Sequence, residues 1–263
     1  MALYFGSKLS TPIIRVGDTE NMILQDKTVS YTGNEQVIKA DNSYYGLNSV
    51  TIEPADEVIR GSDLRLFINN ELTELKEFHF EGMSSIPLNK FRNNTGLIKV
   101  TVPLNTLDNY YYHGMDINNS AFAGCTNLSE FNFENVNYIS SFAFNGCTSL
   151  VSVKLSNYYT ASYLSDYSFA GCTSLESVDL SEVSSSSLTI MKNCFYNCTN
   201  LTYVSLPSSL TELGQAAFYN CSNLTSLNYA GSMSEWSSVT LGSEWKTNSG
   251  ITTVICSDGT ITL

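Results

Sequence analysis

The middle of the chain repeats one pattern of hydrophobic and polar residues five times. Each copy has a Phe, a Gly or Asn two residues later, then Cys, then Thr or Ser, and finally a closing Leu. The copies begin at Phe122, Phe144, Phe169, Phe195 and Phe218. The closing Leu recurs every 22 to 26 residues. Self-similarity at this period is typical of a solenoid, in which each unit buries its apolar face against its neighbours. The sequence therefore predicts a stack of similar units.

The residues after each closing Leu alternate between apolar and polar, which is the pattern of a strand with one buried face. In the unit 169–180, Val178 and Leu180 are expected to point into the stack, and Ser177 and Asp179 to face outward. Equivalent strands are expected at residues 97–102, 128–133, 150–155, 201–206 and 224–229. Stacked at about 4.8 Å, these strands would form a parallel sheet along the solenoid.

The corner before each strand carries turn chemistry. Gly and Asn tolerate positive φ, and Thr and Ser bond to nearby backbone groups. The Phe that opens each copy is expected to fill the core from the opposite wall, where short turns or helical turns are predicted. Because stacked strands leave open edges at both ends, the two terminal units need caps.

The pattern continues upstream in a weaker form. The unit that begins at Phe91 keeps the Phe, Thr and Leu but has Asn94 at the Cys position. Before it, residues 75–80 fit the strand template. A rival frame interprets residues 80–86 as a corner, but it leaves only 11 residues between Phe80 and Phe91, too few for a unit. The strand interpretation is therefore preferred.

The cysteines indicate core filling. The chain has seven, an odd number, so they cannot all pair internally. Side chains that project in parallel from one repeat position have poor disulfide geometry, and free Cys behaves as a small hydrophobe. Cys194 and Cys198 have the spacing of a metal-binding pair, but Cys194 aligns with Ala or Ser in the other units. No zinc-type spacing joins the two histidines to the cysteines. No metal and no cofactor is predicted.

Composition excludes some partners. The formal net charge is −12, and the basic residues form no run, so a nucleic-acid partner is not expected. No run approaches the roughly 18 to 20 apolar residues of a membrane span, so membrane insertion is not expected. The N-terminus also lacks the basic segment followed by an apolar stretch that marks a signal peptide.

Three regions are predicted from where the repeat begins and ends. Residues 1–56 form a small β module, residues 57–230 form the solenoid, and residues 231–263 form a C-terminal cap. Trp236 and Trp245 belong to the cap. They are interpreted as its core, with a ligand platform as the alternative.

The repeated phrase resembles the BspA-like class of leucine-rich repeats, over roughly residues 62–230. This resemblance implies a β-rich leucine-rich-repeat solenoid that serves adhesion or ligand display in surface proteins, without catalysis. The segment 24–54 is similar to a short segment of tail or surface proteins of phages and prophages. The two resemblances imply an extracellular, cell-surface or virion location, and a partner that is a host or bacterial surface protein or a glycan.

No catalytic residue is predicted, because the outward strand positions hold no Ser/His/Asp or Cys/His arrangement. Tyrosine density suggests where a partner would bind, since Tyr offers flat amphipathic area at low entropic cost. The alternative is that these rings pack over the edges of their own loops. The candidate partner-binding residues are Tyr110, Tyr111, Tyr112, His113, Tyr158, Tyr159, Tyr163 and Tyr203.

Three classes of function therefore stay open. The first is a non-catalytic binding or adhesion module for a protein or glycan. The second is a structural spacer of a phage tail or cell-surface assembly with no specific ligand. The third is an enzyme, which would need a deep pocket with a perturbed titratable group.

Overall fold

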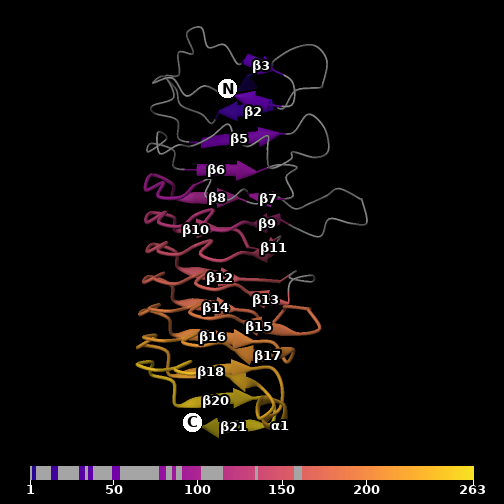
Figure 1. The fold of residues 1–263 in the computed structure, drawn as a ribbon, viewed down its shortest axis with the longest axis vertical. Coiled ribbons are helices and arrows are strands. Elements are labelled where there is room, and N and C mark those ends of the chain that lie inside the picture. Colours follow the sequence, from indigo (N-terminus) through magenta and orange to yellow (C-terminus); the bar gives the residue numbers. More distant parts are fainter. Residues whose placement is uncertain are drawn as a thin grey trace.

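The computed structural model describes residues 91–101, 115–133, 136–156 and 162–263, and upstream of these the strands β1 to β7. The upstream strands are β1 (Ala2–Leu3), β2 (Ile13–Val16), β3 (Ser30–Thr32), β4 (Glu35–Val37), β5 (Ser49–Glu53), β6 (Glu77–Phe80) and β7 (Ser85–Ile86). The structure is a solenoid of stacked parallel strands, as the sequence predicts (Figure 1).

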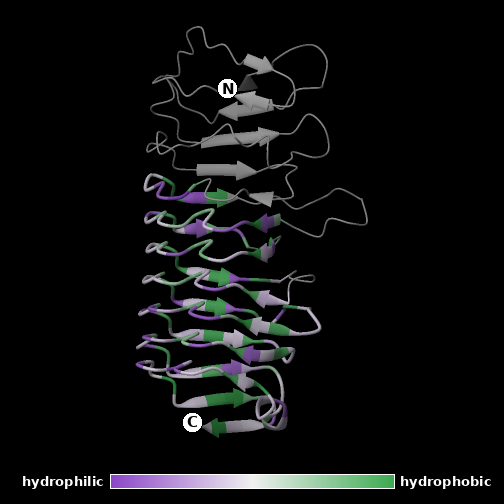
Figure 2. Cartoon of the chain, viewed as in Figure 1, coloured by the Kyte–Doolittle hydropathy of each residue, from purple (hydrophilic) through white to green (hydrophobic). Residues whose placement is uncertain are grey.

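Each coil of the solenoid contributes to two β walls. The first β wall contains the strands that the repeat predicts. From the N-terminal side these are β6, β8 (Lys99–Thr101), β10 (Glu130–Phe131), β12 (Ser152–Lys154), β14 (Ser177–Asp179), β16 (Tyr203–Leu206) and β18 (Ser226–Tyr229). Strand β20 (Thr253–Cys256), in the segment predicted as the cap, extends the same wall. Strand β6 confirms the strand interpretation of residues 75–80. Apolar residues recur at the same place on successive strands of this wall (Figure 2).

The second β wall was not predicted. Its strands are β7, β9 (Met115–Ile117), β11 (Val136–Ile139), β13 (Tyr163–Leu164), β15 (Leu188–Ile190), β17 (Leu210–Leu213) and β19 (Thr240–Leu241). Each follows a first-wall strand along the chain and pairs in parallel with a neighbour on its own wall, but β11 and β13 are not paired, so this wall consists of two sheets. The solenoid is therefore closed by three sides, two of strands and one of turns.

The register on the first β wall confirms the predicted inward and outward positions. Ser177 lies opposite Tyr203, and Val178 lies opposite Val204. Val178 and Val204 are fully buried, whereas Tyr203 is exposed. The pairing is not continuous, however, because β10 ends one sheet and β12 begins the next. We attribute the break to Phe131 and Phe133, which take the places of Val and Leu, and whose rings contact the Phe144 ring at centroid distances of 4.9 and 5.3 Å.

The turn wall forms its own ladder of backbone hydrogen bonds. The amide of Phe122 donates to the carbonyl of Ala143 at 2.8 Å, and the amide of Gly124 donates to that of Asn145 at 2.8 Å. Equivalent bonds join the later coils. The predicted Gly or Asn corner has positive φ in every described coil, with values between 57° and 74°. From the coil of Phe122 onward, the residue four positions before the corner also has positive φ, between 53° and 59°. The corner residues are Asn93, Gly124, Gly146, Gly171, Asn197, Asn220 and Asn248.

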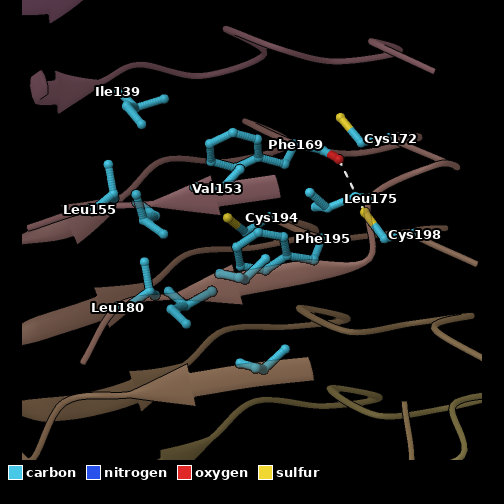
Figure 3. Packing of buried hydrophobic residues seen from close by; sticks show 14 of the residues in the cluster. Ile139, Val153, Leu155, Phe169, Cys172, Leu175, Leu180, Cys194, Phe195 and Cys198 are labelled. Atoms are coloured by element: carbon cyan, nitrogen blue, oxygen red, sulfur yellow. Dashed lines mark hydrogen bonds between the residues drawn. The ribbon is translucent and has the colours of Figure 1, made fainter. Parts of the chain in front are cut away.

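The phenylalanines of the repeat form a continuous stack in the core. Six rings from Phe91 to Phe218 lie one above another, with neighbouring centroids 5.0 to 5.5 Å apart and planes within 12° of parallel. All six side chains are fully buried. Figure 3 shows two of these rings, Phe169 and Phe195, among the leucines of the first β wall. The prediction that these residues fill the core is confirmed.

The cysteines form a second column beside the rings. The thiol that follows each Gly or Asn corner donates to the carbonyl oxygen of the Phe one coil earlier, as Cys198 does to Phe169 at 3.2 Å (Figure 3). The same contact is made by Cys125, Cys147, Cys172 and Cys221. That carbonyl also accepts the amide of the Cys in its own coil. Cys is therefore favoured here because it is small, apolar and able to donate one weak bond. All seven cysteines are free.

This burial predicts that the repeat thiols do not react in the folded protein. Burial raises the pKa of Cys172 to about 12, so almost no reactive thiolate forms at neutral pH. We expect N-ethylmaleimide to leave the six repeat cysteines unmodified under native conditions, and to modify all seven after unfolding, as counted by intact-mass spectrometry. Cys256, in the terminal hairpin, should react first. Native modification of Cys172 within minutes would contradict the packing.

The C-terminal segment continues the solenoid for one more coil before it ends. Strand β20 pairs in parallel with β18, and β21 (Gly259–Thr262) then folds back antiparallel to β20. The carbonyl of Trp245 accepts the amide of Phe218, just as the carbonyl of Ala217 accepts the amide of Phe195. Trp245 is therefore the equivalent of Ala217, and Lys246 occupies the place of the stacked Phe. Trp236, in the short helix α1 (Met233–Trp236), and Trp245 are only 4% and 8% exposed. The interpretation of both as core is confirmed, and the ligand-platform alternative is wrong.

The N-terminal strands join the first β wall directly. Strand β5 pairs in parallel with β6 and antiparallel with β2, so the sheet crosses the predicted boundary at residues 56 and 57. Strands β1, β2 and β5 thereby end the parallel sheet with antiparallel partners. The division into three regions stays a prediction.

Candidate functional site

The outward face of the first β wall is mostly small and polar, and both of its described lysines form ion pairs. Lys99 forms an ion pair with Glu130 at 3.0 Å. Lys154 forms one with Glu182 at 3.2 Å. Tyr203, beside Ser177, is 46% exposed on this wall, and Ile255 on β20 is 44% exposed. Exposed ion pairs of this kind contribute little to stability, so we interpret this wall as a solvated face.

The second β wall carries a cluster of polar and aromatic side chains from three successive strands. Asp116 comes from β9, Asn137 and Tyr138 from β11, and Tyr163 from β13. The Asn137 side-chain amide donates to the Asp116 carboxylate at 2.9 Å. The hydroxyl groups of Tyr138 and Tyr163 lie 3.4 Å apart, and the two rings meet edge to face at a centroid distance of 5.6 Å. We call these four residues the tyrosine–aspartate cluster.

An irregularity in β11 explains why the cluster forms there. Val136 lies opposite Met115, but Tyr138 lies opposite Asp116, so β11 has one residue more than β9 over this stretch. Asn137 and Tyr138 are therefore both partly exposed, with Tyr138 also packed against the core, while Val136 and Ile139 are buried. A bulge of this kind re-aims side chains and is frequent near binding sites.

The Tyr138 ring is supported from the next coil. Its hydroxyl oxygen lies 3.3 Å from the Ser165 hydroxyl oxygen, and Ser165 in turn donates to the carbonyl of Ile139 at 2.8 Å. These contacts fix the hydroxyl group of Tyr138. The exposed Tyr163 ring therefore packs against a ring whose position is fixed. Tyr163 itself is 41% exposed. The cluster therefore exposes the Tyr163 ring to solvent, and the Tyr138 ring supports it from one side.

Burial changes the acidity of the carboxylate in the cluster. Partial desolvation raises the pKa of Asp116 above its usual value, and the hydrogen bond from Asn137 offsets only part of this rise. The ionised carboxylate is thus less well solvated than one on an open surface, and a group that compensates its charge would be stabilising there.

The turn wall carries two further pairs of aromatic rings. Phe142 stacks on Tyr167 at 4.8 Å, and Tyr196 stacks on Tyr219 at 5.1 Å. Phe142 and Tyr167 both have positive φ, at 59° and 57°, which is unusual for bulky residues. In each pair, one face of each ring is covered by the other ring.

The structure separates the two predicted site residues that it describes. Tyr163 lies in β13 on the second β wall, and Tyr203 lies in β16 on the first. They do not form one surface patch. The other six predicted residues lie outside the described part of the chain: Tyr110, Tyr111, Tyr112, His113, Tyr158 and Tyr159. In the sequence, the first four precede β9 and the last two precede β13.

Sequence reasoning missed Asp116, Asn137 and Tyr138. The available signal was the apolar–polar–apolar pattern of residues 115–117, which marks a strand with an outward Asp116. The described residues contain no group of three His, Cys, Asp or Glu that could hold a metal ion. In the same part of the chain, no helix has the length and apolarity to cross a membrane.

Comparison with known proteins identifies the repeats. Residues 115–243 match the BspA type leucine rich repeat region, in six copies. Within residues 115–243, the coils of the solenoid are similar to BspA-type leucine-rich repeats. Repeat proteins of this kind are generally protein-binding or surface modules. No curated protein matches the sequence.

Several solved leucine-rich repeat structures are similar in shape. One is the leucine rich repeat protein TpLRR of T. pallidum, with 20% identity and a TM-score of 0.45, covering 74% of this chain and 79% of that one. Another is a leucine rich cell surface protein of Faecalibacterium prausnitzii, with 17% identity and a TM-score of 0.44, covering 97% of this chain and 76% of that one.

Proposed function

We propose that this chain is a non-catalytic binding module at a cell or virion surface, and that it presents the second β wall to a protein or glycan partner. The observation that supports the proposal is the tyrosine–aspartate cluster. It combines an exposed ring with a partly desolvated carboxylate on neighbouring coils of this wall, and Tyr is enriched among the residues that anchor interfaces.

The repeat itself favours a binding role over a reaction. A solenoid held together by a stacked core offers an extended outer surface that can be varied without disturbing the fold. The two tyrosine-rich segments, 110–113 and 158–159, lead in sequence into β9 and β13, the outer strands of the cluster. The proposed partner surface is therefore the second β wall together with these segments.

The test is a binding screen of the whole chain against panels of surface proteins and glycans, read by biolayer interferometry. A partner should be found, and its affinity should fall at least about tenfold when Tyr111, Tyr112 and Tyr159 are all replaced by Ser, because loss of aromatic anchors costs more than about 1 kcal/mol each. The matched control is Tyr203→Ser on the first β wall, which should bind as the wild type does.

Circular dichroism and thermal unfolding must show that the triple variant keeps its fold. A screen with no partner in either panel would favour the structural spacer of a phage tail or surface assembly instead. Equal loss of affinity in Tyr203→Ser would place the partner on the first β wall and contradict the proposed surface.

A further inference from the structure

The two β walls differ in how their negative charges are balanced. On the first β wall, lysines pair with the carboxylates of Glu130 and Glu182. On the described strands of the second β wall, from β9 to β19, the charged residues are Asp116 and Glu212, and no strand carries a Lys or Arg. The basic residue that is nearest in sequence to any of these strands is Lys192, which follows β15 and belongs to the turn wall. The second β wall is thus acidic without a cation of its own among the described residues.

The Asp116 carboxylate is held in place rather than free to rotate. Asn137 donates to one of its oxygens at 2.9 Å, and Asn137 is the extra residue of the bulge in β11, next to Tyr138, which lies opposite Asp116. The amide leaves the negative charge in place. A cationic donor can therefore still form a charge-assisted hydrogen bond with this carboxylate.

The exposed ring of Tyr163 adds a second feature that favours a cation. The negative face of an aromatic ring attracts cations, and a guanidinium group also stacks on it through its planar shape. The chain contains an internal example, because the Lys246 ammonium lies 5.9 Å from the centroid of the Trp245 ring. The Asp116 carboxylate lies opposite Tyr138, whose ring meets the exposed Tyr163 ring. A carboxylate followed by two rings matches the two features of an arginine side chain, which are its several N–H donors and its flat face.

We propose that the tyrosine–aspartate cluster docks an arginine side chain of a partner protein, with the guanidinium group against the Asp116 carboxylate and the paired rings of Tyr138 and Tyr163. This inference rests on the proposed binding function and names the chemistry of its partner. The protein's net charge of −12 attracts a basic segment at long range, which speeds association.

Charge also decides against two other occupants. A nucleic acid would bring phosphates toward Asp116 with no basic residue of the described wall to receive them. A second copy of this chain, docked through the same wall, would place Asp116 and Glu212 of one copy against the same residues of the other, which is repulsive.

The test uses the full chain with tyrosine rings labelled with carbon-13, observed by NMR. The probe is Nα-acetyl-arginine methylamide, and its comparator is the citrulline analogue, which has nearly the same shape but no charge. In the wild type, the ring signals of Tyr163 and Tyr138 should shift with the arginine probe, and about tenfold more comparator should be needed for the same shift.

Two variants and two matched controls locate the site. Asp116→Asn should weaken the effect of the arginine probe about tenfold, since the side-chain oxygen that it retains can still accept the amide of Asn137 and keep the fold while the charge is removed. Tyr163→Ser should abolish the shift of Tyr138. Glu212→Gln, on β17 of the same wall, and Tyr203→Ser, on the first β wall, should leave the shifts unchanged.

Several results would overturn the proposal. These are an equal response to the citrulline analogue, an unchanged response in Asp116→Asn, and a response centred on Tyr203. The partner screen is scored separately. A protein or glycan partner that binds Asp116→Asn as tightly as the wild type overturns the arginine site but leaves the binding function standing.

Discussion

Replacing Phe169 by Ala should lower the free energy of unfolding by about 3 to 5 kcal/mol, the range for a large aromatic removed from a packed core. Phe169 stacks between Phe144 and Phe195 at 5.3 and 5.5 Å, and the Phe133 ring touches its edge at 6.0 Å. Backbone hydrogen bonds on the first β wall and the turn wall join the Phe169 coil to both of its neighbours, so these coils cannot collapse into the space left by the ring. A cavity in the centre of the stack is therefore expected.

Urea unfolding followed by circular dichroism measures this effect, with Phe142→Ala as the control. Phe142 is also a stacked phenylalanine, but it lies on the turn wall and is 37% exposed, so its replacement should cost less than about 1 kcal/mol. Because solenoids can unfold in parts, the midpoint and the slope must both be compared. A cost at Phe169 no larger than that at Phe142 would show that the rings do not carry the core.

The features that recur with the same residue in every unit could be predicted from the sequence. Phe, Cys and Leu stand at fixed offsets because each must fit against its copy in the next coil, and this requirement leaves little freedom of residue type. The corner residues are similarly restricted by positive φ, which Gly124 and Asn197 both adopt. These constraints are local to one repeat and are visible in a single chain.

The second β wall could not be predicted, because its strands carry no common residue. They are two to four residues long, and the pairings of β11 with β9 and of β15 with β17 each contain a register shift that breaks the alternation. The positive φ four residues before each corner of the turn wall could not be predicted either. Phe142, Tyr167 and Ala216 all have it, and they share no residue type that would indicate it. The last coil could not be recognised in the sequence, because Lys246 and Ser249 stand where the other units have Phe and Cys.

The candidate site was only half visible for a related reason. Tyrosine density indicated Tyr163, which lies in the cluster, and Tyr203, which does not. Asp116 and Asn137 are 21 residues apart and meet only through the register of β9 and β11. That register depends on the bulge in β11. A single sequence shows the spacing of the coils but not which outward residues one extra residue brings together.

Gly242→Ala is expected to be the second strongly destabilising change, at about 1 to 3 kcal/mol, because it overpacks backbone against backbone. A Cβ at this position would lie 2.5 Å from the amide nitrogen of Gln215 and 2.6 Å from the carbonyl carbon of Gly214. Both atoms belong to the preceding coil, which is itself tied to β15 by the bond from the Gly214 amide to the Ile190 carbonyl at 2.7 Å. Gly242 is not among the described glycines with positive φ, so steric contact alone supplies the cost.

Thermal unfolding of Gly242→Ala beside Ser243→Ala measures this cost. Ser243 is the next residue and is exposed, so the same methyl side chain there should change the melting temperature by little. The loss at Gly242 should appear first in the C-terminal coil, because β19 must move away from β17 to admit the methyl group. Accelerated N-ethylmaleimide modification of Cys256 in Gly242→Ala would report that local opening. A melting temperature equal to that of Ser243→Ala would mean that the coils are not in the close contact that the structure gives them.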